Sequence, residues 1–184
     1  MTSPSACQVR GLSVRRLSAS EGRHHLGALA EVLADCVAGG ASVSFMAPFS
    51  RADAELFFQS VLDEVEAGKR ILLAAFCDSQ LVGTVQILTA TPPNQPHRAD
   101  LAKLLVLRSA RVKGIGSLLV EHAEEAARLA GKTLLVLDTV TGQSAEKLYI
   151  RLGWTRVGVI PNYAMFPDGT WCDTTVFYKQ LGSS

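Results

Sequence analysis

The sequence has almost no excess of charge of either sign. Its 184 residues include 18 Lys and Arg against 17 Asp and Glu, which gives a formal net charge of +1. A surface that binds nucleic acid or an anionic membrane depends on a broad positive field, and a near-neutral chain lacks one. We therefore expect neither nucleic acid nor a membrane among its partners, and any basic character must be local.

Long hydrophobic runs are also absent. The longest, Ile71 to Cys77, has seven residues, far below the roughly 20 that a membrane-spanning helix needs. The first residues, Met1 to Arg10, have no apolar core of the kind found in a signal peptide. The four cysteines are widely spaced, which favours free thiols over a disulfide framework. Together these absences predict a cytoplasmic protein.

Histidines, cysteines and acids at the spacing of metal ligands are missing as well. The histidines do not occur at metal-ligand spacing with cysteines or acids, so no metal site is predicted. The composition is otherwise that of an ordinary globular protein, with 48% apolar and 19% charged residues. We expect a single domain over residues 8–182, preceded by a short flexible N-terminus at residues 1–7.

Hydrophobic periodicity predicts an α/β fold in the order β-α-α-β-β-β-α-β-α-β-β. The helix expected over 116–130 directs one set of side chains inward (Leu118, Leu119, His122, Ala126 and Leu129) and another outward (Glu121, Glu124, Glu125 and Arg128). The other expected helices cover 21–37, the residues between Pro48 and Ala67, and 144–152. Strands are expected over 9–17, 70–77, 81–89, 100–107, 133–137, 154–160 and 171–181.

One segment concentrates the features of a binding site. Arg111 to Gly116 (RVKGIG) connects an apolar strand to an amphipathic helix, and the free N–H groups at a helix N-terminus attract anions. Gly114 and Gly116 allow a phosphate to approach the main chain, while Arg108 and Lys113 add positive charge. These features indicate a pyrophosphate site, although a tight turn with solvated basic residues is the alternative. The absence of a third glycine and of a Gly-Lys-Ser/Thr ending argues against the Rossmann and P-loop patterns.

Two motifs in this order resemble those of the GNAT (GCN5-related) N-acetyltransferase superfamily. Arg111 to Gly116 fits its R/Q-x-x-G-x-G/A loop, and Ala145 to Trp154 (AEKLYIRLGW) resembles its A-x-x-L-Y-x-x-x-G-F segment. Gly39 to Ala47 (GGASVSFMA), Lys103 to Gly116 and Thr175 to Gly182 look more specifically like the tabtoxin-resistance acetyltransferases. Those proteins acetylate the amine of a β-lactam-containing amino-acid toxin. The resemblance implies a central mixed, mostly antiparallel sheet flanked by helices.

The resemblance also implies a co-substrate, acetyl-CoA, whose acetyl group passes directly to an amine. The backbone of a strand segment is implied to pair with the pantetheine arm: Leu105, Val106 and Leu107. The loop and the start of the next helix are implied to hold the pyrophosphate: Arg111, Val112, Lys113, Gly114, Ile115, Gly116 and Ser117. Tyr149 is implied to contact the cofactor sulfur.

Three side chains are candidates for catalysis. Tyr149 is implied to protonate the departing thiolate, the alternative being a tyrosine that only packs in the core. Asp138 follows a buried strand and Asp100 begins another, and the resemblance assigns carboxylates at these positions to the substrate ammonium and its deprotonation. The family carries the longer Glu at the first of the two positions, where this chain has Asp100. A strand-end cap and a solvated loop acid are the alternative roles.

These residues favour an N-acetyltransferase that acts on a small primary amine such as a β-lactam or an amino-acid-like toxin. A CoA-binding module without catalysis is one alternative. A protein or peptide N-acetyltransferase is another, and it predicts an open groove, whereas we expect segment 39–50 to cover the site. Phe45, Met46 and Trp171 shape the acceptor pocket or belong to the core. A homodimer is expected through an exposed edge strand over 171–181.

Overall fold

The computed structural model describes residues 11–111 and 114–182. The N-terminus expected at residues 1–7 and the predicted cofactor ligands Val112 and Lys113 lie outside the described residues. A short 3-10 helix, η2, covers Arg108–Ala110. The remaining elements are β1 (Leu12–Leu17), α1 (Ala19–His24), α2 (Leu26–Ala38), α3 (Arg51–Glu66), β2 (Arg70–Cys77), β3 (Gln80–Leu88), β4 (Arg98–Val106), α4 (Ile115–Leu129), β5 (Leu134–Val140), α5 (Ser144–Arg151), β6 (Thr155–Met165) and β7 (Trp171–Gln180).

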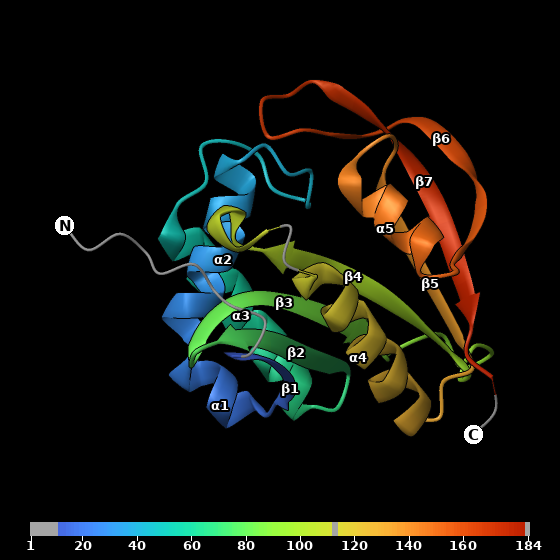
Figure 1. Cartoon of the computed structure of the whole chain (residues 1–184), viewed down its shortest axis with the longest axis horizontal. Helices are drawn as coiled ribbons and strands as arrows, with labels where there is room; N and C mark the ends of the chain where they lie inside the picture. The colour runs from blue at the N-terminus through green and yellow to red at the C-terminus, as the bar shows by residue number, and fades with distance from the viewer. Residues whose placement is uncertain (1–10, 112–113, 183–184) are drawn as a thin grey trace.

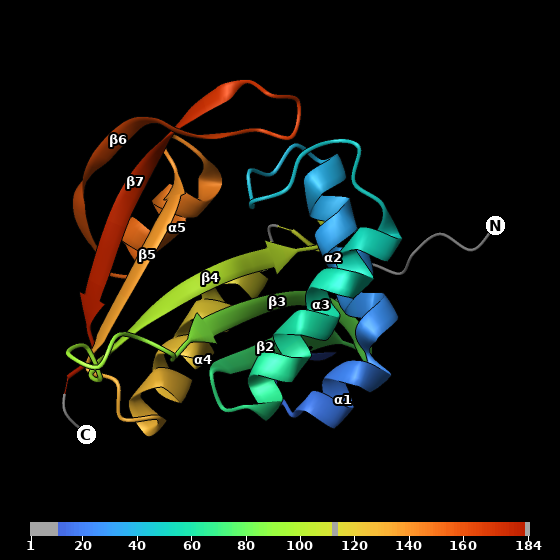
Figure 2. The same ribbon diagram turned by 180° about the vertical axis from the view of Figure 1, so that it is seen from behind.

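The strands form one seven-stranded sheet in the order β1-β2-β3-β4-β5-β7-β6. Every neighbouring pair is antiparallel except β4 and β5, which are parallel and joined through α4. Helices α1, α2 and α3 cover one face, while α4 and α5 lie on the other (Figure 1 and Figure 2). The predicted α/β fold with a mixed, mostly antiparallel sheet is therefore confirmed.

The sheet separates in the middle. Strands β4 and β5 are in register only where Arg98 to Asp100 lie beside Leu134 to Val136, and beyond this point they diverge (Figure 1). The C-terminal half of β4 thus has β3 on one side and, among the described residues, no strand partner on the other. Backbone groups on that free edge are available to a ligand.

A β-bulge interrupts β4 just after the strands separate. Thr84 pairs with Leu105 and Gln86 with Ala102, so one residue of β3 faces two residues of β4. Lys103 lies in this bulge with φ of +53°, a left-handed conformation that is uncommon for residues other than glycine. A β-bulge changes the direction of a side chain. Here the bulge directs the side chain of Lys103 into the space between the two halves of the sheet.

The expected helix over 21–37 is two helices, so that prediction is wrong about its continuity. Ser18 and Glu21 form a reciprocal capping box that starts α1 earlier than the apolar pattern suggested. His25, with φ of −96° and ψ of 11°, ends α1 and begins α2. The apolar residues of the segment 21–37 begin at Leu26, after the break, so the apolar pattern does not mark where α1 ends.

The buried face of α4 is rotated relative to its predicted face. Glu124, expected outside, is buried because it accepts hydrogen bonds from Trp154 Nε1 at 2.9 Å and from Lys179 Nζ at 2.7 and 2.8 Å. His122 and Leu129, expected inside, are exposed. The helix directs Ile115, Leu119, Val120, Ala123 and Ala127 inward instead.

The edge of the sheet is also not where the sequence placed it. Strand β7 lies between β5 and β6, so the expectation that 171–181 forms an exposed edge is wrong. The edge strand next to β7 is β6, and β1 forms the opposite edge of the sheet. Strand β6 is longer than predicted because its pairing with β7 continues to Met165. It leaves Val157, Val159 and Ile160 exposed.

Cys36 and Cys172 are free thiols, whereas Cys77 is disulfide-bonded. The expectation of four free thiols is therefore wrong at Cys77, because sequence spacing reveals only close cysteine pairs. In the part of the chain that the structure describes, no helix combines the length and apolar character required to cross a membrane.

Candidate active site

A cleft of about 1200 Å³ opens between the two halves of the sheet. Segments far apart in the sequence contribute to its lining: the end of α2 and the loop after it, β4, the start of α4, β5, α5, and the turn between β6 and β7. Among the residues singled out from the sequence, the cleft brings together the cofactor and catalytic candidates Leu105, Val106, Arg111, Gly114, Ile115, Gly116, Ser117, Asp138 and Tyr149. The acceptor-pocket candidates Phe45, Met46 and Trp171 line it as well. Leu107 and Asp100 do not line it.

One end of the cleft is the N-terminus of α4. Gly114 occupies the N-cap position with φ of +77° and provides no side-chain cap, so the first-turn N–H groups of the helix remain available to an anion. At Gly116, a Cβ would lie 3.3 Å from Leu148 Cδ2 of α5, tighter than an ordinary contact. These two glycines fit the close approach of a phosphate group to the main chain.

Arg111 lies beside this anion-binding end. Its Nε donates to the Val106 carbonyl at 3.2 Å, and its Nη2 lies 3.7 Å from Cys36 Sγ. Burial raises the pKa of the Cys36 thiol, so the sulfur is held as a neutral packing group. Arg111 therefore connects α2, β4 and the phosphate loop, and its remaining guanidinium N–H groups lie at the cleft.

Arg108 has a different role from the one considered in the sequence. Its backbone N–H and its Nε each donate to the Asp35 carboxylate at 2.8 Å. Although burial raises the pKa of Asp35, these hydrogen bonds outweigh it and lower that pKa overall. Arg108 thus ties the end of β4 to α2 and is not free to turn toward the cofactor phosphates.

The three backbone positions expected to pair with pantetheine are not equivalent. The N–H of Leu107 donates to the Val82 carbonyl of β3 at 2.9 Å, so it is already used. Leu105 and Val106 lie on the part of β4 that has no partner strand on the β5 side and line the cleft. Because backbone groups alternate along a strand, Leu105, which pairs with Thr84, faces β3 as Leu107 does. The open side therefore belongs to Val106, whose carbonyl accepts from Arg111 Nε and whose N–H fits an extended ligand that pairs as an additional strand.

Tyr149 reaches the cleft from α5 and is otherwise buried. Its ring packs against Trp154 and Phe177, with centroid distances of 5.6 and 6.1 Å. Burial, and secondly the negative charge of Asp138, raise the pKa of the phenol well above its usual range. The hydroxyl therefore stays protonated, which is the state required of an acid that donates to a leaving group.

The structure separates the two candidate aspartates. Asp138 lies within β5, exposed in the cleft, and makes no hydrogen bond or ion pair with any described residue. Asp100 is ion-paired with Arg98 at 2.5 Å, beside Val136 at the point where β4 and β5 still pair. Only Asp138 is positioned to meet a ligand in the cleft.

The opposite side of the cleft is bridged by two loops. Ser42 Oγ donates to the Met165 carbonyl at 2.7 Å, and the Ala47 N–H donates to the Pro167 carbonyl at 2.9 Å. The segment after α2 is thereby attached to the turn between β6 and β7, and the two lie at the same end of the molecule (Figure 2). The expected cover over the site, segment 39–50, is positioned by these contacts.

Sequence reasoning missed one functional candidate on this side. Lys103 Nζ donates to Ser44 Oγ at 3.0 Å inside the cleft. Desolvation lowers the pKa of Lys103, while the charge of Asp138 raises it and that of Arg70 lowers it. The one available signal was a lysine in the apolar strand LAKLLVL, which reads as an ordinary solvent-facing position.

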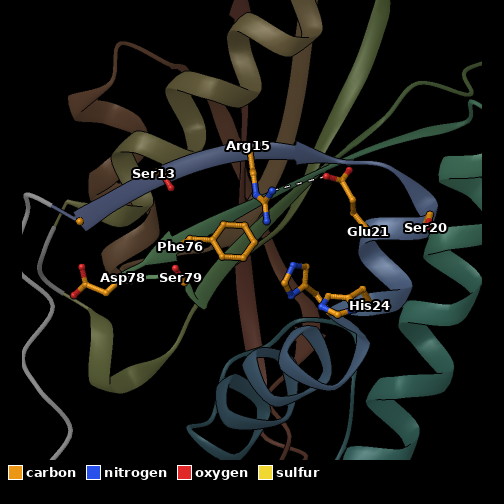
Figure 3. A pocket seen from close by; sticks show the side chains of 10 residues that line it. Ser13, Arg15, Ser20, Glu21, His24, Phe76, Asp78 and Ser79 are labelled. Carbon is orange, nitrogen blue, oxygen red and sulfur yellow. Dashed lines mark ion pairs between the residues drawn. The ribbon is translucent and has the colours of Figure 1, made fainter.

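A second cavity, of about 910 Å³, lies at the other end of the sheet beside β1 and α1. Arg15 stacks over Phe76, 4.4 Å from the ring centroid, and its Nη1 lies 3.8 Å from Glu21 Oε1 (Figure 3). The guanidinium of Arg15 is thus already paired with Glu21. None of the predicted site residues that the structure describes lines this second cavity. The chemistry belongs to the cleft between β4 and β5.

An uncapped helix N-terminus beside a free strand edge, with an acid and a base candidate between them, defines a group-transfer enzyme with a phosphate-containing co-substrate. The model of the Acetyltransferase (GNAT) family matches residues 27–154, which is more than half of the chain. The protein belongs to the GNAT family and is an acetyltransferase that uses acetyl-CoA.

Individual relatives agree with this assignment. An uncharacterized N-acetyltransferase in the hisH-hisA intergenic region of Azospirillum brasilense is 28% identical over 152 residues, covering 80% of this chain and 89% of its own. The structure of YncA from Salmonella typhimurium, with its cofactor acetyl-CoA, matches with a TM-score of 0.76 and 17% identity, covering 95% and 96%. RimL, a ribosomal L7/L12 alpha-N-protein acetyltransferase in complex with CoA, also has a TM-score of 0.76 and 17% identity, covering 97% and 98%.

Proposed function

We propose that the protein acetylates the primary amine of a small molecule, of the amino-acid or β-lactam kind that the tabtoxin-resistance group accepts. The observation that carries this proposal is the bridge over the acceptor side of the cleft. Ser42 and Ala47 are hydrogen-bonded to Met165 and Pro167 across its two walls. A cleft bridged at this side suits a compact molecule better than an extended peptide.

The residues of the cleft divide the chemistry between them. Bound acetyl-CoA supplies the activated acetyl group. Asp138 holds the acceptor ammonium and takes up the proton that the amine must lose before it can attack a carbonyl. Tyr149 donates its phenolic proton to the sulfur as the carbon–sulfur bond breaks. The N–H groups of the first turn of α4 and the side chain of Arg111 hold the pyrophosphate.

Asp100 has no part in this arrangement. Its carboxylate is paired with Arg98, and it does not line the cleft. We propose that Asp100 has a structural role in the pairing of β4 with β5, because the short parallel register between these strands ends at Asp100 and Val136. The deprotonation step thus depends on one carboxylate, Asp138.

The alternative acceptor is a protein N-terminus or a lysine side chain. The RimL neighbour is a protein acetyltransferase, but at 17% identity its similarity concerns the fold alone. The experiment supplies acetyl-CoA with a panel of free amino acids, β-lactam amines and short peptides, and measures the released thiol. Turnover of the small amines supports the proposal. Turnover of the peptides alone replaces it with the alternative.

We further propose that the protein forms a homodimer through β6, one of the two edge strands of the sheet. Val157, Val159 and Ile160 are exposed along it, and an apolar edge strand is a common site of association. Analytical ultracentrifugation is expected to show a dimer for the native protein and a monomer for Val157→Lys. A monomeric native protein contradicts this proposal.

A further inference from the structure

Lys103 presents an ammonium group that forms no ion pair with a carboxylate of the described residues. Among the described residues, its Nζ has one hydrogen-bond partner, Ser44 Oγ at 3.0 Å, and no ion pair. An ammonium carries three N–H donors, and a partly buried cation is costly unless an anion or several acceptors compensate it. Lys103 thus has unused capacity to bind a negatively charged group.

The backbone holds this side chain inside the cleft. Lys103 and Ser44 both adopt left-handed conformations, with φ of +53° and +78°, which are uncommon for residues with a side chain and carry a strain cost. Lys103 lies in the bulge of β4 and Ser44 in the loop after α2, so two independent segments are distorted where their side chains meet. Such distortions tend to be retained at ligand-binding positions.

The charges around Lys103 favour an anionic ligand that also carries an amine. The carboxylate of Asp138 acts on both Lys103 and Tyr149, so these three groups surround one region of the cleft. Arg70, the other charge that acts on Lys103, is already paired with Glu64 at 2.7 Å. Asp138 and Lys103, neither of which is ion-paired with a described residue, line the cleft from β5 and from β4. An anion and a cation placed in this way match a zwitterion.

We infer that Lys103 binds a carboxylate of the acceptor substrate while Asp138 binds its ammonium, which makes Lys103 a specificity-determining residue for amino-acid-like acceptors. This inference rests on the proposed function, because it concerns the same acceptor site. It adds a requirement that the reaction itself does not impose: the acceptor carries a negative charge close to the amine that is acetylated.

The test compares standard α-amino acids, each paired with its own α-amide, as acceptors for the native enzyme and for Lys103→Met. We expect the native enzyme to prefer the carboxylate, and Lys103→Met to reduce the carboxylate-to-amide ratio of kcat/KM by about 10- to 100-fold, mainly through KM. Comparing the ratio between enzymes cancels the difference in amine basicity between acid and amide. Lys103→Arg, which keeps the charge, is expected to retain part of the preference.

Lys69→Met is the matched control, because Lys69 is exposed and does not line the cleft. It is expected to preserve the native ratio. A native enzyme that uses acids and amides equally overturns the inference and leaves the proposed function intact. An equal loss of kcat/KM on acids and on amides in Lys103→Met also overturns the inference and leaves the proposed function intact, because it indicates that Lys103 only supports the Ser44 loop. Failure of the native enzyme to acetylate any small amine refutes the proposed function itself.

Discussion

Asp138 and Asp100 have similar positions in the sequence but different surroundings in the molecule. The first is exposed in the cleft and has no hydrogen-bond or ion-pair partner in residues 11–111 and 114–182, and the second is ion-paired with Arg98. We expect Asp138→Asn to lower kcat/KM by about 100-fold or more, because the amine loses its proton acceptor. Asp100→Asn is the matched control, expected within about threefold of native in the same thiol-release assay. Equal losses in both variants restore the two-carboxylate hypothesis.

Tyr149 is expected to act as a proton donor. Tyr149→Phe should lower kcat by about 100-fold without changing acetyl-CoA affinity, because the ring still packs against Trp154 and Phe177. Steady-state rates and calorimetric binding measure the two effects. Tyr178→Phe, which removes the same hydroxyl outside the cleft, is expected to be neutral. An unchanged kcat in Tyr149→Phe excludes the acid role.

The same variant also has an expected effect on stability. Burial raises the pKa of Tyr149 above its ordinary value of 10.0, so above that pH the unfolded chain loses a proton that the folded protein keeps. The stability from the neutral buried phenol is therefore present below about pH 10 and is lost as the pH rises further, by up to about 1.4 kcal/mol per pH unit. Urea unfolding between about pH 9 and pH 11 should show a steeper loss for native protein than for Tyr149→Phe.

At the scale of elements, α4 is anchored by a buried ion pair. Glu124 contacts Trp154 at the start of β6 and Lys179 on β7. Removing the carboxylate leaves the Lys179 ammonium, which is 21% exposed, with the Leu152 carbonyl as its one remaining partner in the described part of the chain. We expect Glu124→Ala to lower the free energy of unfolding by about 3 kcal/mol, measured by urea denaturation. Glu125→Ala, at an exposed position of the same helix, should change it by less than about 0.5 kcal/mol.

The N-terminus of α4 offers a second comparison. Gly114 has φ of +77° with open space around it, and Gly131, at the other end of the helix, has φ of +74° and equally open space. Alanine at either position should cost about 1 kcal/mol of stability, since the left-handed conformation disfavours a side chain. Only Gly114→Ala is expected to weaken acetyl-CoA binding, by calorimetry. Equal affinity in both variants contradicts the phosphate site.

Most elements were predictable because their apolar periods are set by burial against the sheet. The exceptions have separate causes. Glu124 is buried because Lys179 and Trp154 reach it, and no local pattern in the sequence reveals these distant partners. The start of α1 is set by the local capping box of Ser18 and Glu21, which the apolar pattern does not show, and the break between α1 and α2 lies at His25.

At the scale of the whole molecule, the residues expected at the cofactor end come from one short segment, whereas the acceptor end was predicted only in part, through Phe45, Met46 and Trp171, which line the cleft. Gly114 and Gly116 belong to one short segment, residues 111–116, and the spacing of its Arg and Gly residues is enough to indicate a phosphate site. The acceptor end is assembled from the loop after α2, the bulge of β4 and the turn between β6 and β7, which only the folded sheet brings together. Lys103 was missed for this reason, because its environment depends on Ser44 and Asp138.

The central claim, that this acetyltransferase acts on small amines, is tested most directly by following labelled acetyl groups. A bacterial lysate is divided into small-molecule and protein fractions, and each is incubated with the enzyme and isotope-labelled acetyl-CoA before mass spectrometry. The account predicts enzyme-dependent label in the small-molecule fraction, on compounds with a primary amine. Label that enters proteins or peptides and leaves small amines unmodified would contradict it.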